Sequence, residues 1–192
     1  MRSARFLLAL LFLDAAWAQP DAALVEQLRG GGYLLYMRHA STDFSQSDAR
    51  MTSYEDCASQ RNLTDKGREE ARVVGAHIAR LEIPIGDVLA SPYCRTVESA
   101  RLAFGRAQPT QQVRGGPART DDPARYEPLR KLLGTKPPGR RNIFIASHGN
   151  PFYAVAGPPY LAEGEIAVVR PEGDSRFTVV ARIRPEDWQL LE

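Results

Sequence analysis

Apolar strands alternate with amphipathic helices along most of the chain. Apolar runs of strand-forming residues occur at 33–37 and 142–146, with a shorter one at 88–90. Between them, apolar residues at helical spacing predict helices that begin at Thr64 and at Ser91, with these two residues as N-caps. This alternation favours an α/β fold. We expect a three-layer α/β/α arrangement with a mostly parallel central sheet.

The remaining pattern is less regular. Apolar spacing predicts a short helix over 21–28, and two late strands, 166–170 and 177–183, are typical of a closing hairpin. Gly, Pro, Gln and Arg dominate 105–142, where the pattern predicts only a short helix around 126–133.

The N-terminus has the pattern of an export signal. Its start is basic, the apolar run 6–13 is too short to span a bilayer, and Ala16-Trp17-Ala18 is a small-x-small cleavage site. These features predict a signal peptide over 1–18 and a single domain over 19–192, exported to the periplasm or secreted. An N-terminal membrane anchor is the alternative. We expect no membrane span in the mature chain.

Charge and cysteine content indicate which partners and which cysteine chemistry to expect. The whole chain has a net charge of +2, and the mature part is close to neutral, so we expect no nucleic-acid partner. Cys57 and Cys94 are the only cysteines, and in an exported protein an even count favours a disulfide over two separate thiols. Neither cysteine has the spacing of a zinc site.

Histidine and arginine residues follow the predicted strands. Arg38 and His39 end the first strand, His148 follows the strand 142–146, and Arg95 lies in the helix after 88–90. Ligands of α/β sheets bind beyond the carboxyl ends of the strands, where these residues meet. A neutral imidazole is a nucleophile, guanidinium groups grip phosphate oxygens, and a cationic second histidine would stabilise the transferring group. The set suits phosphoryl transfer.

Four segments carry a resemblance to a known family. Arg38-His39-Ala40 resembles the Arg-His-Gly signature of the histidine phosphatase superfamily, with alanine in place of glycine. Further motifs of that superfamily are matched, in order, by Asn62-Leu63-Thr64-Asp65-Lys66-Gly67, Ala90-Ser91-Pro92-Tyr93-Cys94-Arg95-Thr96-Val97-Glu98-Ser99-Ala100 and Ser147-His148-Gly149-Asn150. The resemblance runs from about residue 33 to 156 and is to the small, phosphoglycerate-mutase-like branch, here as an exported member.

The resemblance implies roles for the strand-end residues. It implies that His39 is transiently phosphorylated and catalytic. It also implies that Arg38, Arg95 and His148 form the phosphate pocket, that no metal or other cofactor takes part, and that the partner is a small phosphorylated substrate. Arg61 is a secondary candidate for the phosphate, and Asn150 for a supporting hydrogen bond. A zinc site built from His39, His148 and a cysteine lacks a ligand-spacing motif.

The proton donor to the leaving group has no motif. Glu165 and then Glu163, which follow the second histidine, are the candidates for a catalytic acid. Asp121, Asp122 and Glu127 lie in the region where larger family members supply this acid, again without a motif. Without an acid, substrates with good leaving groups, such as phosphohistidine or acyl phosphates, would be favoured.

The leading hypothesis is an exported, metal-independent phosphatase that hydrolyses a phosphomonoester through a phosphohistidine on His39. One alternative is a catalytically inactive protein that binds phosphate or a phosphosugar. Another is a phosphomutase, which would require a bisphosphate cofactor. We expect the loops 41–61, 105–142 and 157–164 to select the substrate.

Overall fold

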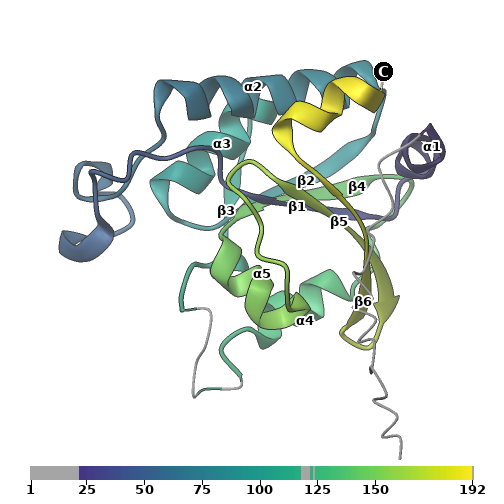
Figure 1. Cartoon of the computed structure of the whole chain (residues 1–192). Helices are drawn as coiled ribbons and strands as arrows, with labels where there is room; N and C mark the ends of the chain where they lie inside the picture. The colour runs from purple at the N-terminus through teal and green to yellow at the C-terminus, as the bar shows by residue number, and fades with distance from the viewer. Residues whose placement is uncertain (1–21, 118–121, 123, 192) are drawn as a thin grey trace, which may run out of the picture.

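The computed structural model describes residues 22–117, 122 and 124–191. The predicted signal peptide, residues 1–18, lies outside the described residues. Six strands form one sheet between two groups of helices (Figure 1). The strands are β1 (Leu34–Arg38), β2 (Ile85–Ala90), β3 (Gln108–Pro109), β4 (Asn142–Ser147), β5 (Ile166–Gly173) and β6 (Arg176–Ile183). The α-helices are α1 (Ala22–Gly30), α2 (Asp65–Arg80), α3 (Cys94–Phe104), α4 (Glu127–Leu133) and α5 (Gly149–Ala156).

The sheet has the order β3-β2-β4-β1-β5-β6. The first four strands of this order pair in parallel, and β5 and β6 add an antiparallel hairpin at one side. The central pair, β1 and β4, is in a register that sets Arg38 opposite Ser147. The expected α/β fold with a mostly parallel sheet is therefore confirmed, and so is the closing hairpin.

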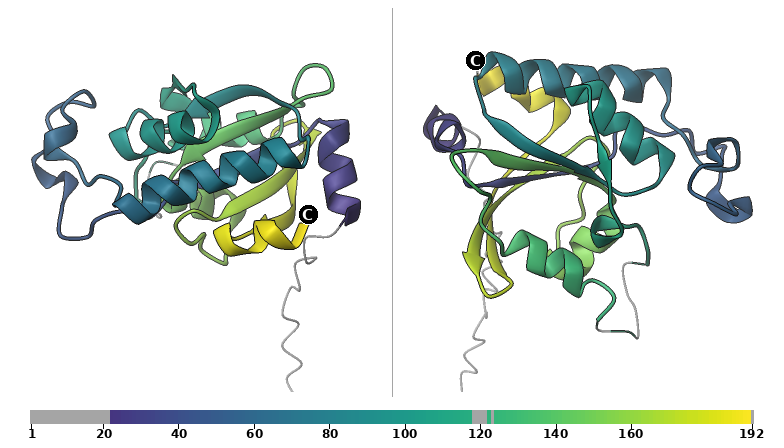
Figure 2. Two further views of the ribbon diagram at one scale, coloured as in Figure 1. Left: turned by 90° about the horizontal axis from the view of Figure 1, so that it is seen from above. Right: turned by 180° about the vertical axis from the view of Figure 1, so that it is seen from behind.

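Helices cover both faces of the sheet. In Figures 1 and 2, α2 and α3 lie on one face together with the 3₁₀-helix η4 (Pro185–Leu191), while α4 and α5 lie on the other. Side chains of β1 alternate between the two cores, as a strand requires: Leu35 packs on the α2–α3 side, and Leu34 and Tyr36 pack on the α4–α5 side. The layers hold the parallel strands rigidly, so their carboxyl ends make a fixed platform. Within the described residues, no helix combines the length and apolarity needed to cross a membrane.

Of the two predicted N-caps, one is present in the structure and the other is not. Thr64 caps α2, and its hydroxyl accepts a hydrogen bond from the Gly67 amide, as predicted. Ser91 does not cap α3, which instead begins at Cys94 with Tyr93 as the N-cap. The prediction was wrong because Ser91 is fully buried and its hydroxyl forms a hydrogen bond with His148, which directly follows β4.

The segment between β1 and α2 projects beside the helices. It contains two 3₁₀-helices, η1 (Asp48–Arg50) and η2 (Cys57–Ser59), and appears as the blue loops beyond α2 and α3 in Figures 1 and 2. A single antiparallel bridge joins Thr42 to Leu63 at its base. The segment therefore leaves and rejoins the fold at one place, next to the end of β1.

Candidate active site

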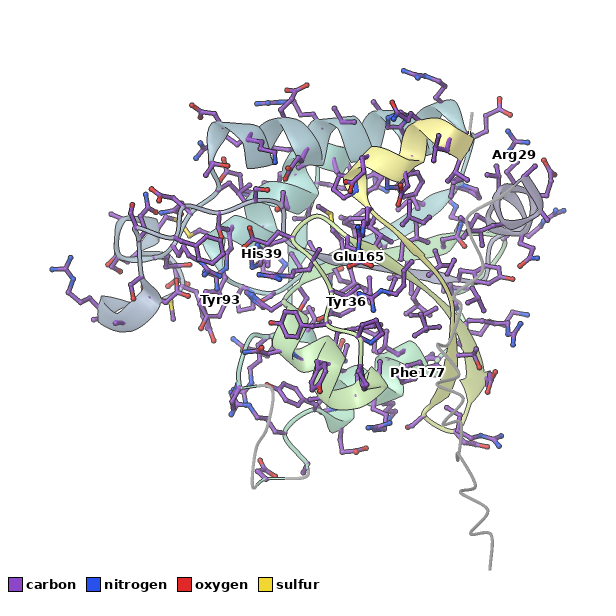
Figure 3. All side chains as sticks on the ribbon, viewed as in Figure 1. Arg29, Tyr36, His39, Tyr93, Glu165 and Phe177 are labelled. Carbon is purple, nitrogen blue, oxygen red and sulfur yellow. A yellow bond between two sulfur atoms is a disulfide. The ribbon has the colours of Figure 1, made fainter. Side chains whose placement is uncertain are left out.

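A cavity of about 590 Å³ lies beyond the carboxyl ends of the parallel strands. His39 and Tyr93, both labelled in Figure 3, lie at this end of the sheet. The cavity is lined by residues from β1, β4, α3 and the loops around them: Arg38, His39, Gln46, Ser47, Asp48, Ala49, Arg61, Tyr93, Arg95, Gly115, Gly116, Pro117, His148, Gly149, Asn150 and Tyr160. The structure thus brings Arg38, His39, Arg95 and His148 together, with Arg61 and Asn150 beside them.

His39 is held as a neutral ring with a defined tautomer. Its Nδ1 is 2.9 Å from the carbonyl oxygen of Ala40, and because a carbonyl only accepts, Nδ1 carries the proton. Burial and then the nearby Arg95 guanidinium hold the pKa of His39 well below its usual range, so the ring is neutral near pH 7. The lone pair is therefore on Nε2, as a nucleophile requires.

His148 stands edge-on to His39, with 5.5 Å between the ring centroids. Its Nε2 lies 2.9 Å from Ser91 Oγ, the hydrogen bond that draws Ser91 away from a capping role. Burial, followed by the repulsion that would arise if His39 were also protonated, holds the pKa of His148 well below its usual range. The His148 ring is therefore neutral near pH 7 in the free protein. A bound phosphoryl anion favours protonation of His148 and would make the ring cationic.

The guanidinium group of Arg38 is held by residues 160–163. Its Nη1 donates to the carbonyl of Leu161 at 2.9 Å, and its Nη2 donates to Glu163 Oε1 at 3.3 Å. The guanidinium carbon lies 5.3 Å from the centroid of the Tyr160 ring. These contacts fix a permanent positive charge at the wall of the cavity beside His39.

Arg95 has a partner that the sequence patterns did not indicate. Its Nη1 and Nη2 each donate to the carboxylate of Asp48 at 3.0 Å, and Nη1 also donates to the carbonyl of Arg61 at 3.2 Å. Asp48 Oδ1 further accepts from the main-chain amide of Arg61 at 2.9 Å. Asp48 lies in the polar segment 41–61 among other acidic residues, and only the folding of that segment distinguishes it.

Two further arginine donors are unsatisfied. Among the described residues, the buried Nε atoms of Arg61 and Arg95 have no hydrogen-bond partner. Buried donors are nearly always paired, and a guanidinium is paired best by an anion with several oxygens. The cavity therefore has the charge and the donors to receive a phosphoryl group.

The comparisons with known proteins agree with this geometry. The family model described as "Histidine phosphatase superfamily (branch 1)" matches residues 34–116, which include Arg38, His39 and Arg95. This segment of the chain is therefore similar to the histidine phosphatase superfamily. The match indicates phosphatase activity. A search of curated proteins finds no match.

Solved structures of histidine phosphatases share the fold. The protein histidine phosphatase SixA with tungstate has a TM-score of 0.58 at 20% identity, over 81% of this chain and 98% of that one. A mycobacterial glucosyl-3-phosphoglycerate phosphatase with inorganic phosphate has a TM-score of 0.59 at 15% identity, over 81% of this chain and 99% of that one. A mutant of a phosphoserine phosphatase from Entamoeba histolytica, in complex with phosphoserine, has a TM-score of 0.55 at 12% identity, over 81% of this chain and 98% of that one. At these identities the likeness concerns the fold alone.

Alanine replaces the signature glycine of this superfamily at position 40 without backbone strain. Ala40 is not among the described non-glycine residues with a positive φ, so its backbone conformation does not call for glycine. Its amide is 3.2 Å from Ser99 Oγ, and its carbonyl orients His39. The substitution therefore preserves the main-chain contacts around His39.

Glu165, the first candidate for the acid, is not brought to the cavity. Its carboxylate is buried and bonds to Arg182 Nε at 2.7 Å and Nη2 at 2.9 Å, and it accepts from the Ala162 amide. Glu163 is closer, with Oε1 3.9 Å from His39 Nδ1, but it binds Arg38 and both the amide and hydroxyl of Thr42. Because Glu163 is near the protonated Nδ1, it lies on the side of the His39 ring away from the Nε2 lone pair. Neither glutamate lines the cavity, so geometry lends neither support as the proton donor.

Glu165 is expected to matter for stability. Arg182 also donates to the carbonyls of Pro159 and Tyr160, so the pair holds the loop that carries Tyr160. Glu165→Gln leaves the buried Arg182 charge without a counter-charge and should lower the free energy of unfolding by about 3–5 kcal/mol. Urea unfolding measures this, and phosphatase activity per folded molecule should change little. A stable Gln variant with no activity would return Glu165 to the list of catalytic residues.

The predicted disulfide is present. Cys57 and Cys94 are bonded, with their Cα atoms 5.7 Å apart. The bond ties η2 to the first residue of α3, next to Arg95, and it consumes both thiols, which removes the zinc site considered from the sequence. No group of three or more metal-ligating side chains occurs in the described parts of the chain. A disulfide is typical of periplasmic or extracellular proteins.

Proposed function

We propose that this protein is an exported, metal-independent phosphatase that hydrolyses a phosphomonoester through a phosphohistidine on His39. The observation that carries the proposal is the hydrogen bond from His39 Nδ1 to Ala40, which leaves the lone pair on Nε2 in a cavity lined by Arg38, Arg95 and His148. Export rests on the predicted signal peptide over 1–18 and is consistent with the disulfide.

In this mechanism, His39 Nε2 attacks phosphorus while Arg38 and Arg95 hold the phosphoryl oxygens, and the ester P–O bond breaks to release the alcohol. Electrostatic stabilisation of the transferring group is the main catalytic need of phosphoryl transfer, and the arginines with a protonated His148 supply it. Water then attacks the phosphohistidine, and the P–N bond breaks to release phosphate. The three similar structures act, by their names, on different substrates, so we propose only a small phosphorylated molecule as the substrate.

Trapping of the intermediate tests the proposal. The mature protein, residues 19–192, is mixed with an aryl phosphate labelled with ³²P and quenched in alkali, which preserves phosphohistidine. We expect released phosphate, label on the peptide that contains His39, and no effect of a chelator. Label on another residue would contradict the mechanism. Phosphate binding without label or release would favour the inactive binding protein, and transfer between positions without release would favour a mutase.

A further inference from the structure

One acidic side chain faces the candidate active site. Within residues 22–117, 122 and 124–191, Asp48 is the only carboxylate among the residues that line the cavity. Glu163 and Glu165 are held outside the lining by Arg38 and Arg182. The sequence patterns gave Asp48 no role, and the mechanism above does not use it.

Asp48 lies where a bound phosphoryl group must meet it. Both of its carboxylate oxygens accept from the terminal nitrogens of Arg95, which are the donors that a phosphoryl group would use. A phosphoryl group at Arg95 therefore either shares these donors with Asp48 or displaces its carboxylate. In each case the carboxyl group lies next to the phosphoryl oxygens.

Burial places Asp48 on the side of the leaving group. Both residues line the cavity, but His39 is only 2% exposed, whereas the Asp48 side chain is 30% exposed. We infer from this difference that His39 lies deeper and Asp48 nearer the mouth. In phosphoryl transfer the attacking and leaving atoms are roughly in line through phosphorus. The leaving group opposite His39 therefore points toward the mouth, where Asp48 stands.

We propose that Asp48 is the residue that transfers protons to the leaving group and from water in this active site. The proposal rests on the phosphohistidine mechanism above. In the first step, Asp48 takes the proton of a monoanionic phosphoester. The His39 Nε2 lone pair forms the N–P bond, the P–O bond breaks with its electron pair on the leaving oxygen, and Asp48 gives that oxygen the proton.

The second step uses Asp48 as a base. A water oxygen forms a bond to phosphorus, the P–N bond breaks with its pair returning to His39 Nε2, and the water proton goes to the Asp48 carboxylate. Asp48 then returns this proton to the departing phosphate, which leaves as the monoanion. Asp48 and His39 are both restored. Because a proton donor assists poor leaving groups, the substrate class extends to alkyl phosphomonoesters.

The leaving-group dependence of Asp48→Asn tests the proposal. In the mature protein with its disulfide, kcat/KM for an alkyl ester such as glycerol phosphate should fall about 100-fold or more, because the alkoxide loses its acid. For p-nitrophenyl phosphate, whose leaving group needs no proton, kcat/KM should fall less than about threefold. The variant should also show a burst of p-nitrophenolate, because the second step loses its base.

Matched variants separate this role from a structural one. Asp43→Asn, in the same segment and with its carboxylate accepting from Ser45, should behave as the wild type. Asp48→Glu keeps an acid and should retain more alkyl-ester activity than Asp48→Asn. An equal loss for both esters would show that Asp48 only positions Arg95. Unchanged rates with tighter binding of inorganic phosphate would show that it is only a counter-ion. Both results overturn the proposal.

If Asp48→Asn does not fold, kinetic measurements on the wild type test the proposal instead. A weak dependence of its kcat/KM on the pKa of the leaving group supports a proton donor, and a steep dependence opposes one. Failure of the phosphohistidine mechanism is recognised separately, because in that case the wild type forms no labelled His39 with any ester.

Discussion

Replacing His39 by Ala should lower kcat/KM for p-nitrophenyl phosphate by at least about 10⁴-fold. The variant loses the Nε2 atom that forms the bond to phosphorus in the proposed mechanism, while the arginines and His148 remain. An activated aryl ester is the right substrate, since it needs no proton donor and so isolates the loss of the nucleophile. Initial rates of p-nitrophenolate release measure the effect.

The third histidine of the chain gives a matched control. His77 lies on α2, outside the residues that line the cavity, so His77→Ala should keep the wild-type rate. Circular dichroism and thermal unfolding should show that the His39→Ala variant keeps its fold. Turnover retained by folded His39→Ala would end the case for a phosphohistidine intermediate at this position.

Removal of the disulfide should lower the stability of the fold strongly. Cys57 and Cys94 are 37 residues apart, and closing a loop of this length stabilises a fold by about 4 kcal/mol in the chain-entropy account. The double variant Cys57→Ser/Cys94→Ser should therefore melt roughly 10 °C lower. Differential scanning calorimetry measures this change.

The same bond should influence activity. It fastens the segment that carries Asp48 and Arg61 to the start of α3 beside Arg95, so its loss should weaken phosphate binding as well. A reducing agent should reproduce both effects in the wild type and leave the double variant unchanged. If the reduced wild type keeps its melting temperature and its affinity for phosphate, the disulfide has neither role.

Residues fixed by the strands were predictable from the sequence. Arg38, His39 and His148 follow apolar runs directly, and the rule that parallel strands present their carboxyl ends together brings them to one cavity. The cap at Thr64 was predictable for a similar reason, because it depends only on neighbours along the chain. In each case a local pattern decides the position of the side chain.

Residues whose place depends on distant partners were not predictable. Asp48 acquires its position from Arg95, 47 residues away, and Glu165 acquires its position from Arg182 on β6. Ser91 is a good capping residue by type, yet a hydrogen bond to His148 outweighs the helix end. A choice among several acidic residues in polar loops requires the tertiary contacts themselves.

The register of β1 and β4 has a consequence for how new specificities can arise. Arg38 faces Ser147 across the central pair, and the His39 amide continues the ladder to the Ser147 carbonyl at 2.9 Å. The two histidines are therefore spaced by the sheet, while Asp48, Arg61 and Tyr160 come from loops at the rim. Replacement of these rim loops would therefore change the contacts to the substrate, while the sheet would keep the spacing of the two imidazoles.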